Sequence, residues 1–197
     1  MKKIFNVSTI AKIGVLSAIA VIVMLFEIPL WFAPSFYEID LSEVIVLIGG
    51  FALGPVAAIF IELIKIVLNF LINGTVTAGI GEFANFVMGL SFVLPAVYIY
   101  RHKKSMKTAV IGMSVGTVSL AIVGGLANLY LLLPLYAQIY GIPIDVLVDM
   151  GSKINGSITN VYTFVMLATT PFNILKGVLS SVVTLLLYKR LSSILHK

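Results

Sequence analysis

Five polar or ionisable side chains interrupt the most apolar stretches of the sequence, at Glu82, Asn85, Asn128, Asn173 and Lys176. An ionisable group inside a membrane helix costs about 2.5–3.5 kcal/mol on insertion scales, so each such position calls for a reason. Amides can donate and accept hydrogen bonds, and an ammonium group can donate several. They do not form a nucleophile–base set or a metal-ligand cluster. The chemistry that these residue types favour is therefore the binding of a small polar molecule.

The alternative for each asparagine is structural, because lone polar residues in membrane helices often only join neighbouring helices. Asn173 and Lys176 are three residues apart and so share one helix face. Glu62 and Lys65 have the same spacing with opposite charges. We expect them to form a structural ion pair.

Composition places the chain in a membrane. It has 197 residues, of which 60% are hydrophobic and only 11% charged, where a soluble domain averages about 25% charged. The mean hydropathy is +1.12. Cysteine is absent and histidine occurs twice, which excludes disulfides and Cys-based metal or thiolate chemistry. We expect one membrane-embedded domain over residues 1–197.

A transmembrane helix needs about 20 apolar residues to cross the hydrocarbon core of a bilayer. The apolar stretches of the sequence therefore predict an all-α integral membrane protein with six transmembrane helices, of which the second is short. The expected helices are Ile10–Ile28, Glu43–Phe51, Gly54–Ile72, Ile80–Tyr100, Thr108–Leu133 and about Phe164–Tyr188. The segment Tyr136–Tyr162 is expected to carry a short helix over the outer face.

Basic residues fix the expected orientation, because cytoplasmic loops carry an excess of Lys and Arg. Ten of the thirteen fall before or in the first turn of the first helix, between the fourth and fifth, or after the sixth. Six helices place all ten on one side, which predicts that both termini are cytoplasmic. The net charge of +5 is thereby explained without a nucleic-acid partner.

That orientation gives the polar residues a common depth. Glu82 and Asn85 fall in the outer turns of the fourth helix, and Asn128 lies about a turn and a half below the outer end of the fifth. Asn173 and Lys176 fall in the outer half of the sixth helix. We therefore expect one polar pocket that opens to the outside.

Aromatic residues cluster in the outer loop Pro29–Leu41, where Trp31, Phe32, Phe36 and Tyr37 lie near the expected pocket. Rings at a membrane interface often fix the depth of a protein in the bilayer, and this is the favoured role for Trp31. A short loop with four rings could also cover a flat ligand.

Small residues in the first helix, Ala11, Gly14 and Ala18 together with Ser17, form a stripe that permits close approach of another helix. That helix could belong to this chain or to a partner. The sequence has no Walker A loop and lacks the inverted repeat of a self-sufficient transporter. A chain that binds a solute from outside would therefore need a partner to drive transport.

The sequence resembles the substrate-binding S components of energy-coupling factor (ECF) vitamin transporters, and specifically the riboflavin-binding type. The resemblance covers nearly the whole chain. It is carried by the block LIGGFALGP followed by ELIK and GE-x-x-N, and by the segments NLYLLLPLY and PFNILKG.

The resemblance implies a six-helix plasma-membrane protein that captures riboflavin at the outer face. It also implies a membrane-embedded T subunit and two cytosolic ATPases as partners, with no cofactor and no enzymatic activity. Asn128, Asn173 and Lys176 match the flavin-contacting positions of the family, and the loop Pro34–Asp40, with Phe36, Tyr37 and Asp40, would close over the site. The stripe at Ala11, Gly14 and Ala18 corresponds to the surface that meets the T subunit.

Two further hypotheses stay open on the residues alone. The same architecture could carry thiamine, folate or a biotin-like solute. Alternatively, Glu62, Lys65 and Glu82 could belong to a membrane enzyme or scaffold.

Overall fold

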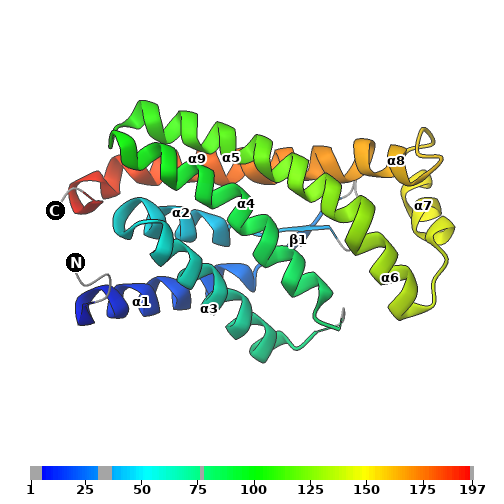
Figure 1. Ribbon diagram of the computed structural model, residues 1–197, viewed down its shortest axis with the longest axis horizontal. Coiled ribbons are helices and arrows are strands. Elements are labelled where there is room, and N and C mark those ends of the chain that lie inside the picture. Colours follow the sequence, from blue (N-terminus) through cyan, green and yellow to red (C-terminus); the bar gives the residue numbers. More distant parts are fainter. Residues whose placement is uncertain (1–5, 31–36, 76–77, 196–197) are drawn as a thin grey trace.

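A computed structural model describes residues 6–30, 37–75 and 78–195 of the chain, and helices make up most of them. Figure 1 shows their arrangement. The helices are α1 Val7–Met24, α2 Ser42–Leu53, α3 Pro55–Asn73, α4 Ile80–His102, α5 Met106–Ala127, α6 Leu133–Tyr140, α7 Ile144–Ser152, α8 Val161–Phe164 and α9 Thr170–Leu195, with π-helical turns η1 Asn128–Leu132 and η2 Val165–Thr169.

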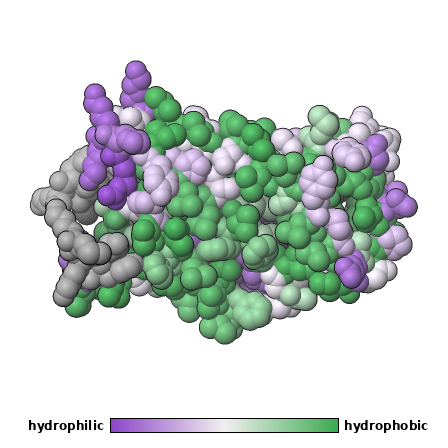
Figure 2. Space-filling view, viewed as in Figure 1, coloured by the Kyte–Doolittle hydropathy of each residue, from purple (hydrophilic) through white to green (hydrophobic). Residues whose placement is uncertain are grey.

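Five helical stretches of the described chain are long and apolar enough to cross a membrane: Val7–Met24, Pro55–Asn73, Ile80–His102, Met106–Tyr140 and Val161–Tyr188. The shorter α2 is the sixth apolar helix. Figure 2 shows hydrophobic residues over much of the face between the two ends of the molecule, with hydrophilic residues gathered at those ends. The predicted all-α membrane fold is confirmed, and the short helix predicted within Tyr136–Tyr162 is present as α7.

The first helix is shorter than predicted, because it ends at Met24 rather than Ile28. Ile28–Pro29 instead forms strand β1, which pairs antiparallel with β2, Glu38–Ile39. The residue before a proline is disfavoured in helical conformation, so Ile28 adopts an extended one. The consequence is a small hairpin that ties the outer loop to the end of α1.

The fifth helix is longer than predicted, because it does not end at Leu133. Instead α5 continues through η1 and α6 to Tyr140. Asn128 thus lies about 18 Å before the end of this continuous helix, at 1.5 Å per residue, rather than the predicted turn and a half. Pro134 lies in the first turn of α6, directly after the π-helical turn η1.

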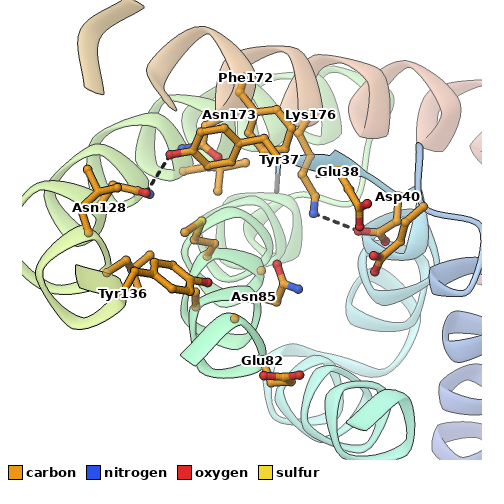
Figure 3. Close-up of a pocket in the computed structure, with 18 of the residues that line it drawn as sticks. Tyr37, Glu38, Asp40, Glu82, Asn85, Asn128, Tyr136, Phe172, Asn173 and Lys176 are labelled. Carbon is orange, nitrogen blue, oxygen red and sulfur yellow. Dashed lines mark hydrogen bonds and ion pairs between the residues drawn. The ribbon is translucent and has the colours of Figure 1, made fainter. Parts of the chain in front are cut away.

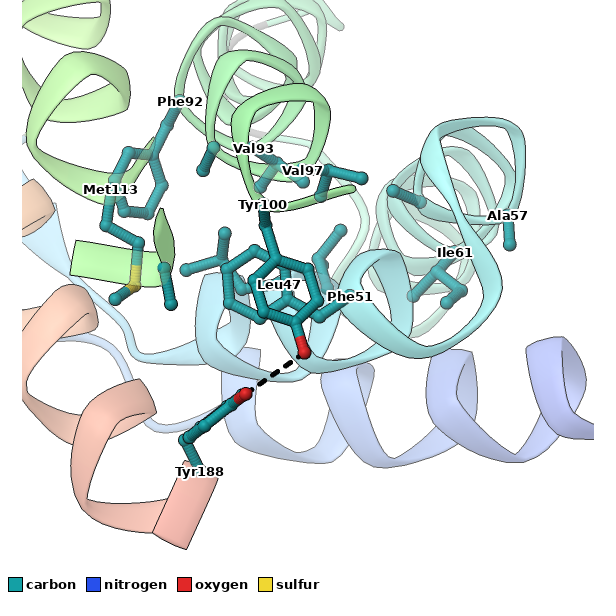
Figure 4. Packing of buried hydrophobic residues seen from close by; sticks show 14 of the residues in the cluster. Leu47, Phe51, Ala57, Ile61, Phe92, Val93, Val97, Tyr100, Met113 and Tyr188 are labelled. Atoms are coloured by element: carbon teal, nitrogen blue, oxygen red, sulfur yellow. Dashed lines mark hydrogen bonds between the residues drawn. The ribbon is translucent and has the colours of Figure 1, made fainter. Parts of the chain in front are cut away.

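The core packs around Leu47, Phe51, Phe92 and Tyr100, which come from α2 and α4 (Figure 4). The Tyr100 hydroxyl lies 3.1 Å from that of Tyr188 on α9, so the pair satisfies two buried hydroxyls.

Helices α4 and α5 approach closely, because glycines face the neighbouring backbone. A Cβ added at Gly112 would lie 2.6 Å from the Ala96 carbonyl oxygen, and one at Gly116 would lie 2.3 Å from that of Phe92. Small residues of this kind allow tight packing of membrane helices. The close packing fixes the position of α4, which carries Glu82 and Asn85.

The two ends of the molecule are formed by different helical segments. The start of α1, the end of α9 and the α4–α5 connection lie at one end, while α6, α7 and α8 lie at the other (Figure 1). The turn between α2 and α3 belongs to the first end, because a Cβ at Gly54 would lie 2.1 Å from Nη1 of Arg101.

Candidate ligand-binding site

A cavity of about 650 Å³ lies between the β1–β2 hairpin, the N-terminal end of α4, α6 and α9. Pockets for drug-sized ligands commonly measure about 300–1,000 Å³. Seven of the eight predicted ligand-binding residues line it: Tyr37, Asp40, Glu82, Asn85, Asn128, Asn173 and Lys176. Phe36, like Trp31 and Phe32, lies outside the residues that the structure describes.

Tyr37 connects the hairpin to the two π-helical turns, and Figure 3 shows its contact with Asn128. Its hydroxyl donates to Oδ1 of Asn128 in η1 over 2.8 Å and lies 2.7 Å from Oγ1 of Thr169 in η2. Because a phenol has a single hydrogen, Thr169 is the donor in the second bond. Nδ2 of Asn128 donates to the Gly124 carbonyl over 2.9 Å. The Asn128 amide is therefore held by partners on both of its polar atoms.

An aromatic wall forms where Tyr37 packs on α9. Its ring is stacked on Phe172, with centroids 4.9 Å apart and an interplanar angle of 28°. Phe164 packs at 6.4 Å from the same ring. Burial raises the pKa of Tyr37 well above its usual range, so the hydroxyl stays neutral and keeps its hydrogen.

Lys176 has an acidic partner that sequence spacing did not indicate. Its Nζ lies 2.9 Å from Oδ2 of Asp40, which is 136 residues away in the chain. Asp40 Oδ1 also accepts hydrogen bonds from the backbone N–H and the hydroxyl of Ser42. Burial alone would raise the pKa of Asp40, but the Lys176 ammonium and these bonds outweigh it and hold that pKa well below its usual range.

Asn173 carries a donor without a partner. It is 1% exposed, and its Nδ2 has no hydrogen-bond partner in the described part of the chain. Gly124 makes room for this amide, because a Cβ there would lie 2.2 Å from Nδ2. A buried N–H group left unpaired costs about 1–3 kcal/mol. A ligand in the cavity can supply the missing acceptor.

A second charge cluster lies behind the cavity wall. Lys65 Nζ is 2.8 Å from both Glu43 Oε1 and Glu62 Oε2, and all three side chains are at most 5% exposed. The predicted Glu62–Lys65 pair is confirmed, and Glu43 is an additional partner. Glu43 also lines the cavity, and its Oε2 accepts no hydrogen bond from the described residues.

Further acidic groups line the cavity. Glu27 and Glu38 both line it, one just before β1 and one in β2. Burial, a hydrogen bond with Glu38 and the charge of Asp40 raise the pKa of Glu27 to about 8. On α4, Glu82 Oε2 accepts a hydrogen bond of 3.1 Å from Thr75. The arrangement is a binding pocket with an aromatic wall, several amides and an acidic lining.

Comparison with known proteins places this chain in one family. The model of that family, the ECF transporter substrate-specific component, matches residues 8–188. The chain belongs to this family. It is therefore an S component, a multi-pass membrane protein that serves transport and is not an enzyme.

Curated relatives cover the S component almost from end to end. "Riboflavin transporter RibU" of Staphylococcus aureus (strain TCH60) is 36% identical over 94% of this chain and 90% of its own length. "Riboflavin transporter FmnP" of Bacillus subtilis (strain 168) is 31% identical over 94% and 93%. A solved structure described as "Structure and mechanism of the S component of a bacterial ECF transporter" is 35% identical, with a TM-score of 0.74 and coverage of 96% and 98%.

The predicted small-residue stripe of this S component lies on the side of α1 that faces away from the other helices of the described chain. Ala11, Gly14 and Ala18 are exposed, and a Cβ at Gly14 would meet nothing within 4 Å. Ser17, which the sequence grouped with them, is instead buried and donates to the Ile13 carbonyl over 2.8 Å. Packing within the described chain therefore does not use the Ala11–Gly14–Ala18 stripe.

Three acidic cavity residues of this S component were missed as site residues from sequence: Glu27, Glu38 and Glu43. The sequence shows them only as acidic residues near the expected outer ends of helices, and nothing in it assigned them to the pocket. The spacing of Glu43 to Lys65, 22 residues, shows no local pattern that predicts contact.

Proposed function

We propose that this chain captures riboflavin at the outer face of the plasma membrane and delivers it to an ATP-driven ECF complex. The complex would supply a membrane-embedded T subunit and two cytosolic ATPase subunits. Riboflavin is the transported ligand in this proposal, and no cofactor takes part. The support is a family match over most of the chain, with relatives named as riboflavin transporters.

The observation that carries the ligand assignment is the cavity, which combines a ring-stacking wall with fixed amides. Tyr37 and Phe172 line one side, and Asn128 and Asn173 line the same space. Riboflavin has a flat tricyclic ring with a polar pyrimidine edge and a polyol chain. Aromatic side chains suit the ring faces, and amides suit its hydrogen-bonding edge.

The test of the ligand is direct, because flavins are coloured and fluorescent. We expect the purified chain to retain riboflavin, identified by mass after denaturation, and to quench the fluorescence of added riboflavin. A preparation that binds thiamine, folate or biotin in its place would assign the chain to another vitamin.

Within the site, we expect Asn173→Ala to weaken riboflavin binding by about 1–3 kcal/mol, the cost of a lost hydrogen bond to a buried group. The amide donor is unpartnered, so the melting temperature without ligand should change little. Lys176→Ala should weaken binding to a similar degree. It should also lower the melting temperature, because it leaves Asp40 unpaired.

The matched control is Gln138→Ala, an exposed amide on α6, which should alter neither quantity. Fluorescence-quenching titrations give the dissociation constants. Normal riboflavin binding by Asn173→Ala would remove this residue from the site.

The orientation follows from the two ends of the molecule. We place the end with the start of α1, the α4–α5 connection and the end of α9 (Figure 1) in the cytoplasm, since most basic residues of the sequence lie in or next to these segments. The cavity then lies toward the outside, and residues 1–197 act as one membrane-embedded binding domain.

Orientation can be read by labelling, because the chain has no cysteine. Ser105→Cys, just before α5, should be protected from an impermeant maleimide in intact cells. It should react once the cells are opened. Asn155→Cys, exposed between α7 and α8, should react in intact cells. The reverse pattern would invert the topology.

A further inference from the structure

Two buried carboxyl groups share one ammonium group inside the helical bundle. Glu43 on α2 and Glu62 on α3 each place an oxygen 2.8 Å from Nζ of Lys65. The side chains of Glu43, Glu62 and Lys65 are 5%, 0% and 1% exposed. If both carboxyl groups were ionised, the cluster would carry one uncompensated negative charge with almost no access to water. Such a charge is costly in a protein interior, and also within a membrane helix.

The neighbouring groups do not supply the missing positive charge. Outside the cluster, Asp40 is the charged group with the largest effect on Glu62, and it is negative. The ammonium group of Lys176 is bound to Asp40 at 2.9 Å, so these two form a pair without net charge. Among the described residues, no group of three or more His, Asp or Glu side chains is arranged to hold a metal ion. A proton is the positive charge that remains for the cluster to take up.

The hydrogen bonds within the cluster distinguish its two carboxyl groups. Nζ of Lys65 donates a hydrogen bond to Oε1 of Glu43 over 2.8 Å. The contact of Nζ with Oε2 of Glu62 is equally short, but neither oxygen of Glu62 accepts a hydrogen bond of regular geometry from the described residues. Buried charged groups are normally held by hydrogen bonds. Glu43 is thus the ionised partner of Lys65, and Glu62 is the carboxyl group without a donor.

Helix α4 brings the two carboxyl groups to one point. A Cβ added at Gly89 would collide with Oε1 of Glu62 and would lie 3.0 Å from Oε1 of Glu43. The missing side chain of Gly89 therefore makes room for both groups against the backbone of α4. Two carboxylates that share one site repel each other, and a single proton removes that repulsion.

We propose that Glu62 keeps a proton in the folded protein, so that Glu43, Lys65 and Glu62 form an electrically neutral cluster. The proton-binding site is built from α2, α3 and α4. Glu43 lines the cavity whereas Glu62 does not, so the proton lies behind the cavity wall. The site does not depend on which solute the cavity binds.

Infrared spectroscopy tests for this proton directly, because a protonated carboxyl group has a C=O stretching band that a carboxylate lacks. The full chain is measured in nanodiscs at neutral pH. We expect the wild type to show a protonated-carboxyl band that is absent from Glu62→Gln. Burial raises the pKa of Glu27 to about 8, so Glu27 contributes a second band. Glu27→Gln is therefore the matched control, and it should lose only that second band and keep the one from Glu62.

Shortening each side chain identifies the group that holds the proton. A protonated aspartic acid absorbs at a different frequency from a protonated glutamic acid in the same surroundings. Glu62→Asp should therefore move the band, while Glu43→Asp should leave a glutamic acid band in place. The reverse pattern would place the proton on Glu43 and overturn the assignment to Glu62.

Melting temperatures give the last arm. Glutamine has the size of a protonated glutamic acid and no charge, so Glu62→Gln should melt close to the wild type at neutral pH. Asp145→Asn, which changes an exposed residue on α7, should also melt like the wild type. A Glu62→Gln protein that melts well above the wild type overturns the proposal, because the wild type would then contain two repelling carboxylates. So does a Glu27→Gln spectrum without a protonated-carboxyl band, even if Glu62→Gln does not fold.

Discussion

Lys65→Met is expected to destabilise the folded protein by about 3–5 kcal/mol, because it leaves buried carboxylates without their cation. Lys65 is 1% exposed and lies 2.8 Å from one oxygen of Glu43 and one of Glu62. Those two side chains come from α2 and α3, so the loss loosens both helices. The measurement is the melting temperature of the purified protein in detergent.

The matched control is Lys153→Met, which changes an exposed lysine and should melt like the wild type. Adding Glu43→Gln and Glu62→Gln to Lys65→Met should restore part of the loss, because no buried charge then remains unpaired. A Lys65→Met protein that melts at the wild-type temperature would show that the cluster contributes little.

Gly14→Trp and Ala18→Trp are expected to abolish riboflavin uptake by the assembled complex while leaving binding by the isolated chain nearly unchanged. Both residues lie on the exposed face of α1, and nothing in the described chain lies within 4 Å of a Cβ at Gly14. An indole there would hold a partner helix away and remove many small dispersion contacts at once.

Both quantities are measured for each variant: riboflavin binding by quenching, and uptake of radiolabelled riboflavin into cells with the complete complex. Ile19→Trp, also exposed on α1 but about 100° around the helix axis from Ala18, should transport normally. Normal uptake by both stripe variants would exclude this surface from the contact with the T subunit. Loss of binding together with stability would indicate packing within the chain.

Much of the fold could be predicted from sequence, because long apolar stretches identify membrane helices. The positions Asn85, Asn128 and Asn173 were also predictable, since polar residues at one depth in separate helices tend to face a common interior. The structure places all three at one cavity.

The pairing of charges could not be predicted in the same way. Asp40 meets Lys176 across 136 residues, and Glu43 meets Lys65 across 22. Such contacts depend on how α2, α3 and α9 pack, which no local spacing encodes. Only Glu62 and Lys65, three residues apart on one helix, showed their contact in the sequence.

The π-helical turn η1 sets the direction in which the residues of α6 point around the helix axis. A turn with i→i+5 hydrogen bonds holds one residue more than an α-helical turn, and one residue corresponds to about 100° around the helix axis. Tyr136, one turn after η1, lines the cavity in this phase. Deleting one residue of η1, such as the exposed Leu131, would swing Tyr136 away although no cavity residue had changed. The direction of the Tyr136 ring therefore depends on the number of residues in η1, so an insertion or a deletion there would change it without any substitution in the cavity.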